Sequence, residues 1–165
     1  NGIIKGNKQG FAEAKSFVQT DVDGRSYVLG LSPIKEFQNY RIVKHLLSSP
    51  GVSSELAPDE KASIIIKGKD IGFDVFAVYP RQANFPLIIP DDKDATYELT
   101  VYLVDDENIV GGYTGDWKVG KNALRSAEEI VFHVVEQGHA SDDERLLFVQ
   151  GLSSYSKNVP APELR

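Results

Sequence analysis

Residues 97–103 alternate between two kinds of side chain, and this alternation constrains the fold more than any other feature. Every second position carries an apolar side chain: Tyr97, Leu99, Val101 and Leu103. The residues between them all carry a polar group: Glu98, Thr100 and Tyr102. Successive side chains of a β-strand point to opposite faces of its sheet. The segment is therefore predicted to be a strand with one face on a core and the other largely toward solvent.

Other short runs rich in β-forming residues recur along the chain, separated by Gly, Pro, Asn and Asp. They cover residues 14–20, 25–31, 62–67, 73–79, 85–89, 109–113, 116–119, 130–135 and 146–149. Long helical patterns do not alternate with these runs, which argues against a parallel α/β sheet. The sequence predicts a mainly β, single-domain antiparallel β-sandwich of the Ig-like or transthyretin-like kind. The alternative is an α+β single sheet with helices on one face.

Residues 33–48 carry the pattern expected of one amphipathic helix. Ser32 and Pro33 suit a helix start, and Pro50 and Gly51 suit a stop. Apolar residues recur between them close to the helical period: Ile34, Phe37, Tyr40, Ile42, Val43 and Leu47. A second stretch, residues 122–129, could also be helical.

A chain of 165 residues is of the usual size for one domain. Residues 11–157 are predicted to form that domain, with a flexible N-terminal tail at 1–10 and a C-terminal tail at 158–165. Within the domain, the Asp23-Gly24 pair suits a tight turn that joins the strands at 14–20 and 25–31. Those two strands are therefore expected to form a hairpin.

The net charge of -6 is unevenly distributed, because residues 81–165 hold 15 acidic and only 8 basic side chains. Such a surface repels phosphate backbones, so a nucleic-acid partner is not expected. No apolar run is long enough for a transmembrane segment. Peripheral or lipid-anchored membrane association stays compatible with the sequence. The absence of Cys and Met resembles that of a processed envelope protein, so an extracytoplasmic location (periplasmic, cell-surface or secreted) is expected.

Residues 111–117 combine three glycines with the chain's single Trp. Aromatic rings beside a carboxylate can stack on a sugar or a peptide side chain and hydrogen-bond next to it. Tyr113, Thr114, Asp116 and Trp117 are therefore predicted to bind a protein or glycan partner. The competing interpretation is a Gly-rich turn whose Trp117 folds back onto the core.

Several acidic clusters fall in predicted loops. Asp21 and Asp23 with Gly24 partly match the middle of a calcium-binding loop, but position 30 is Gly where a closing Glu is required. Further clusters are Asp91, Asp92 and Asp94; Asp105, Asp106 and Glu107; and Asp142, Asp143 and Glu144. If two loops converge, Asp105, Asp106, Asp142 and Asp143 are predicted to hold Ca²⁺, with no other cofactor expected. The alternative is ordinary turn chemistry.

The three histidines, His45, His133 and His139, do not form a recognisable zinc or serine-hydrolase motif. The leading hypothesis is therefore a non-enzymatic binding or scaffold domain of the cell envelope or extracellular space, acting through a loop end or a sheet edge. One alternative is a small hydrolase that uses His133 or His139 with nearby acids, and another is a calcium-dependent binding module. A third is an assembly subunit that pairs through edge strands, because the sequence leaves the oligomeric state open.

Overall fold

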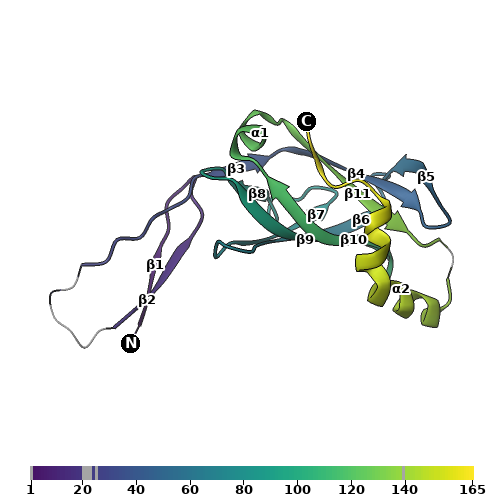
Figure 1. The fold of residues 1–165 in the computed structure, drawn as a ribbon, viewed down its shortest axis with the longest axis horizontal. Helices are drawn as coiled ribbons and strands as arrows, with labels where there is room; N and C mark the ends of the chain where they lie inside the picture. The colour runs from purple at the N-terminus through teal and green to yellow at the C-terminus, as the bar shows by residue number, and fades with distance from the viewer. Residues whose placement is uncertain (1, 20–23, 25, 139) are drawn as a thin grey trace.

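The computed structural model describes residues 2–19, 24, 26–138 and 140–165. It consists of a body and a narrow N-terminal arm that extends away from it (Figure 1). The strands are β1 (Gly2–Gly6), β2 (Ala14–Val18), β3 (Ile34–Phe37), β4 (Asn39–Leu46), β5 (Ser49–Glu55), β6 (Lys61–Gly68), β7 (Asp74–Tyr79), β8 (Leu87–Pro90), β9 (Ala95–Asp105), β10 (Asn108–Val119), β11 (Glu129–Glu136) and β12 (Glu163–Leu164). The helices are α1 (Lys121–Ser126), α2 (Asp142–Tyr155) and a 3-10 turn at Ser156–Asn158.

One large sheet dominates the body, with its strands in the order β5-β4-β11-β10-β9-β6-β7. Its pairs are antiparallel except β4 with β11, which run parallel over residues 39–46 and 129–136. A small sheet of β3 and β8 contributes Phe37, Leu87 and Ile89 to the same core cluster as the large sheet. The mainly β, sandwich-like fold predicted from the sequence is confirmed.

The core lies where the alternating apolar side chains of the large sheet face the small sheet. The predicted alternation in β9 is confirmed, because Tyr97, Leu99, Val101 and Leu103 are at most 2% exposed. Fully burying each such side chain contributes roughly 1.5–3 kcal/mol. In β11 the residues on both faces are buried, as expected for a central strand.

The helix predicted for residues 33–48 is wrong, because this segment forms β3 and β4 instead. Tyr40 and Ile42 alternate into the core, and the whole of β4 pairs with β11. Pro33 does not start a helix but bridges to Phe11. A long-range strand partner thus outweighs a local apolar spacing that fits a helix equally well.

Residues 146–149, predicted as a strand, lie inside α2. This helix begins with a capping box in which Ser141 and Glu144 satisfy each other's backbone N–H groups. Phe148 and Leu152 on its inner face are buried, and Leu152 packs beside Gly112 on β10. The helical alternative for residues 122–129 is confirmed in part by α1.

The arm is built differently from the predicted hairpin. β2 falls within the predicted 14–20 strand, but its partner is β1, taken from the predicted N-terminal tail, rather than residues 25–31. The residues of the proposed turn, 21–23, lie outside the described part of the chain. At the other end, part of the predicted C-terminal tail forms β12, which pairs with β11 at Ile130 and Val131.

Candidate functional site

The predicted contact surface at residues 113–117 is largely buried. Tyr113 and Trp117 are 6% and 3% exposed, so their rings cannot offer a flat face to a partner. Trp117 packs instead against Tyr97 and Phe132, at ring-centroid distances of 6.1 and 6.4 Å. Trp117 is therefore a core residue, and Tyr113 is mostly buried. The reason is register, because Tyr113 and Trp117 pair with Val101 and Tyr97 and so share the core face of the sheet.

Thr114 and Asp116, together with Tyr113, line a shallow pocket of about 440 Å³ between β10 and the C-terminal segment. The polar groups of Thr114 and Asp116 already have partners. The Thr114 backbone N–H donates to Ser156 Oγ at 2.9 Å, and Asp116 accepts a hydrogen bond from Lys69 Nζ at 2.7 Å. The Lys69–Asp116 pair is exposed, so it contributes little stability. This pocket therefore offers a ligand few polar groups that lack a hydrogen-bond partner.

The four acids predicted to hold calcium lie on two elements. Asp105 ends β9 and Asp106 begins the turn to β10 with a φ of 51°, whereas Asp142 and Asp143 lie in the first turn of α2. Asp142 pairs with Arg145 at 3.2 Å rather than with the other acids. Among the described residues, no group of three or more His, Asp or Glu side chains is arranged to hold a metal ion. Asp21 and Asp23 lie outside the described residues.

The remaining predicted acidic cluster also has local partners. Asp92 accepts a hydrogen bond from Ser32 Oγ at 3.0 Å, and Asp94 accepts one from the Lys121 backbone N–H at 2.8 Å. Asp91 lies 3.6 Å from the Arg125 guanidinium. These contacts fasten the loop after β8 to Ser32, which precedes β3, and to α1.

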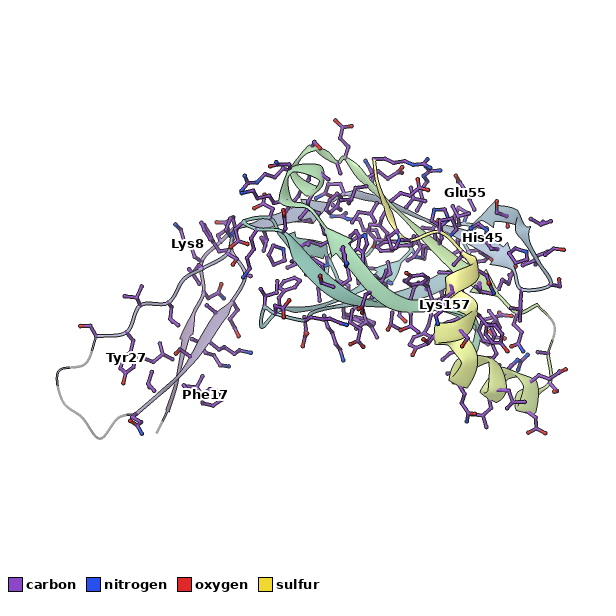
Figure 2. The ribbon with its side chains drawn as sticks, viewed as in Figure 1. Lys8, Phe17, Tyr27, His45, Glu55 and Lys157 are labelled. Carbon is purple, nitrogen blue, oxygen red and sulfur yellow. The ribbon has the colours of Figure 1, made fainter. Side chains whose placement is uncertain are left out.

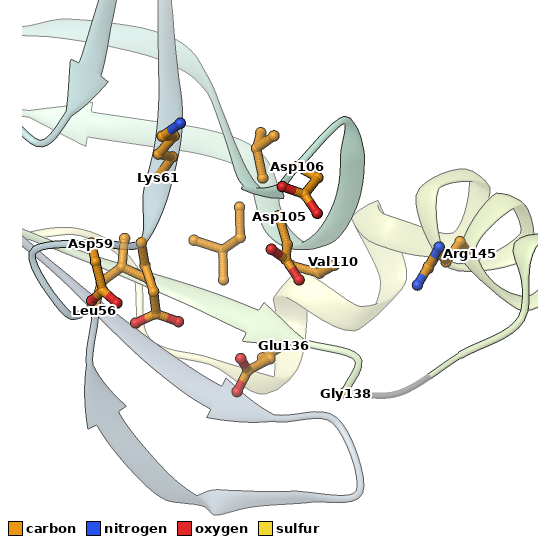
Figure 3. Close-up of a pocket in the computed structure, with 12 residues that line it drawn as sticks. Leu56, Asp59, Lys61, Asp105, Asp106, Val110, Glu136, Gly138 and Arg145 are labelled. Atoms are coloured by element: carbon orange, nitrogen blue, oxygen red, sulfur yellow. The ribbon is translucent and has the colours of Figure 1, made fainter.

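An acidic cleft of about 520 Å³ lies at one end of the large sheet (Figure 3). It is lined by carboxylates from three segments: Asp59, Glu60, Asp105, Asp106 and Glu136. Lys44 Nζ donates to Glu60 at 2.6 Å and to Glu136 at 3.1 Å. Burial alone would lower the pKa of Lys44, but these two hydrogen bonds outweigh it and hold the pKa above its ordinary value. Lys44 thus offsets part of the negative charge of the cleft.

Two histidines far apart in sequence meet on the face of the large sheet opposite Ile42. His45 Nε2 lies 3.0 Å from His133 Nδ1, and His133 Nε2 lies 3.2 Å from Glu163 Oε1. The other nitrogen of His45 contacts the Pro50 carbonyl oxygen at 2.9 Å. All four ring nitrogens are therefore engaged, and none contacts a Ser or Thr hydroxyl within the described residues. His139, the third candidate, lies outside those residues.

The most exposed apolar side chains are on the arm. Phe17 is 86% exposed and Val28 95% exposed, and Ile3, Ile4 and Tyr27 are also exposed. Phe17 and Tyr27 stand on the part of the arm that lies far from the body (Figure 2). The arm holds a two-stranded sheet, and among the described residues β1 and β2 each have one edge without a strand neighbour.

A third segment runs beside the hairpin without joining its ladder. The Tyr27 hydroxyl donates to the Gln19 carbonyl oxygen at 3.0 Å, and Leu29 and Leu31 lie against Gly6. Across the ladder Ile3 lies opposite Phe17, whereas Ile4 lies opposite Ser16 and Val18 opposite Gly2, so a single apolar pair joins β1 to β2. A short Gly- and Lys-containing N-terminal segment looks like a tail unless its strand partner is known.

Comparisons with protein-family models, curated proteins and solved structures found no match for this chain. Within the described residues, no helix is both long enough and apolar enough to cross a membrane.

Proposed function

We propose that this chain is a non-enzymatic binding or scaffold domain that recognises a protein partner through its N-terminal arm. The observation that carries the proposal is the exposure of Phe17 and Val28 on a two-stranded arm that leaves the body. Clusters of large exposed apolar side chains are uncommon on isolated proteins and mark interaction sites. Burying Phe17 alone in a partner would contribute roughly 1.5–3 kcal/mol.

The free strand edges of the arm support the same proposal. An isolated two-stranded hairpin is marginally stable in water, so this arm gains from a further strand or an apolar surface. Its unpaired backbone N–H and C=O groups can extend a partner's sheet. The charged side chains within residues 2–19 are Lys5, Lys8, Lys15 and Glu13.

The hydrolase alternative has less support. His133 has an acidic neighbour in Glu163, as that hypothesis requires, but its other nitrogen is occupied by His45. A general base needs one free nitrogen within hydrogen-bond reach of a nucleophile. Calcium-dependent binding has only the acidic turns in its favour.

Site-specific photo-crosslinking tests the proposal in cells that produce the protein. A benzoylphenylalanine replaces Phe17 in one variant and Leu147 in a matched control; Leu147 lies on α2 and is 64% exposed. We expect discrete protein adducts from position 17 and none from position 147. Identical adduct patterns at the two positions, or no adduct at position 17, would contradict an arm-mediated interaction.

Sedimentation velocity at several concentrations identifies the class of partner. Concentration-dependent association of the purified chain that is lost in Phe17→Ser with Val28→Ser would make the partner a second copy. A monomer at all concentrations, together with adducts of another protein at position 17, would make it a different chain. The exposed pair Leu146→Ser with Leu147→Ser is the control for a general loss of apolar surface.

A further inference from the structure

The two buried histidines form one link in a line of hydrogen-bonding groups that crosses the large sheet. The line starts at the Pro50 carbonyl oxygen on β5, passes through His45 on β4 and His133 on β11, and ends at the Glu163 carboxylate on β12. The three contacts measure 2.9, 3.0 and 3.2 Å. The two rings are 9% and 7% exposed, so water cannot easily complete a missing bond.

This line needs more protons than two neutral rings supply. Each contact needs one hydrogen between its heavy atoms, and both end groups, a carbonyl and a carboxylate, only accept. A neutral imidazole carries one N–H, so two neutral rings can make two of the three hydrogen bonds. A third N–H proton on the histidine pair allows all three hydrogen bonds to form.

We propose that His45, His133 and Glu163 form a one-proton switch that ties β5 to β12 across the sheet only when the histidine pair carries one added proton. The switch lies on the body and uses no residue of the arm. A second added proton would set one ring N–H against the other across the 3.0 Å gap and break the contact between the rings. The histidine pair therefore binds one added proton, and binding of a second is disfavoured.

The two terminal acceptors, the Pro50 carbonyl and the Glu163 carboxylate, determine which of the three contacts lacks a hydrogen at neutral pH. A carboxylate accepts a stronger hydrogen bond than a neutral carbonyl. His133 therefore donates to Glu163, His45 donates to His133, and the contact between His45 Nδ1 and Pro50 lacks its hydrogen. Proton uptake places an N–H on this nitrogen. The expected local result is that β5 is held more firmly, while β12 stays attached.

Charged groups from several strands face the histidine pair. Burial lowers the pKa of His133; the Glu163 carboxylate opposes this, while His45 and Arg165 lower the pKa further. Three further charged groups stand on the same face of the sheet: Arg41 on β4, Glu55 on β5 and Glu129 on β11. They are tied to one another, with Arg41 bonded to both carboxylates.

NMR of the ¹⁵N-labelled full chain tests the proton count. Ring nitrogen shifts report the tautomer and charge of each histidine between pH 8 and pH 5. We expect the His45–His133 pair to gain one proton in all, and exchange of the β5 amides, corrected for intrinsic rates, to slow by about three- to tenfold, the value of one hydrogen bond. Two independent titrations that both reach completion by pH 5 would overturn the switch.

Glu163→Gln completes the line without a proton, because the amide N–H can donate to neutral His133 and both ring N–H groups can then point toward Pro50. We expect slow β5 exchange at pH 8 as well as at pH 5. His139→Gln is the matched control and should keep the wild-type pH dependence. A Glu163→Gln variant with wild-type pH dependence, or its loss in His139→Gln, would overturn the inference.

Discussion

Replacing Trp117 by Ala should destabilise the protein rather than remove a binding contact. The indole is 3% exposed and lies between Tyr97 and Phe132 in the core. Truncating a buried Trp to Ala costs about 3–5 kcal/mol. For a chain of this length each kcal/mol lowers the melting temperature by about 2–4 °C, so a fall of about 6–20 °C is expected.

Far-ultraviolet circular dichroism with heating and with urea measures this loss. Trp117→Phe keeps an aromatic ring in the same space and should lose clearly less stability. Phe17→Ala serves as the surface comparison, because its ring is 86% exposed and its effect should stay within about 0.5 kcal/mol. A Trp117→Ala variant as stable as the wild type, yet unable to bind a partner, would refute this reasoning.

Three further changes test the packing and the titration of the body. Gly112→Ala places a Cβ 2.5 Å from the Val101 carbonyl oxygen, so a loss of about 1–3 kcal/mol is expected in urea unfolding, and an unchanged midpoint would contradict the close approach. Ser141→Ala removes the capping box of α2 and should cost about 1 kcal/mol by the same measurement; a loss below about 0.3 kcal/mol would mean that the box does not hold the helix. Burial lowers the pKa of His133, so the folded state binds fewer protons than the unfolded state below pH 6.5. The unfolding free energy should therefore fall between pH 6.5 and pH 5, by at most about 1.4 kcal/mol per pH unit for one proton, and His133→Phe should flatten that slope in urea titrations at several pH values.

Side-chain alternation was a reliable guide where one face of a strand meets the core. It correctly predicted β9. The apolar run at residues 130–135, which is buried on both faces, correctly predicted β11. Side-chain alternation failed at β4, where Tyr40 and Ile42 fit a strand while Ile34, Phe37 and Tyr40 fit a helix. Local spacing cannot distinguish a helix from a strand here, because the strand is selected by a partner strand about 90 residues later in the chain.

The functional features depended still more on distant neighbours. Trp117 could be assigned to the core or the surface only after the register of β10 with β9 was known. His45 and His133 carry no motif in the sequence, and the parallel pairing of their strands alone brings the rings together. β1 is not recognisable as a strand from its own residues, because what defines it is its pairing with β2, in which Ile3 lies opposite Phe17.

The parallel pairing of β4 with β11 also sets an order of events for a chain emerging from the ribosome. Residues 39–46 leave the exit tunnel early, whereas their partner at 129–136 follows only after most of the body has been made. Until then one side of β4 keeps unpaired backbone groups, and loop closure over such a distance is slow. Nascent chains are expected to be most prone to aggregation in this interval, and a chaperone that shields residues 39–46 would protect them.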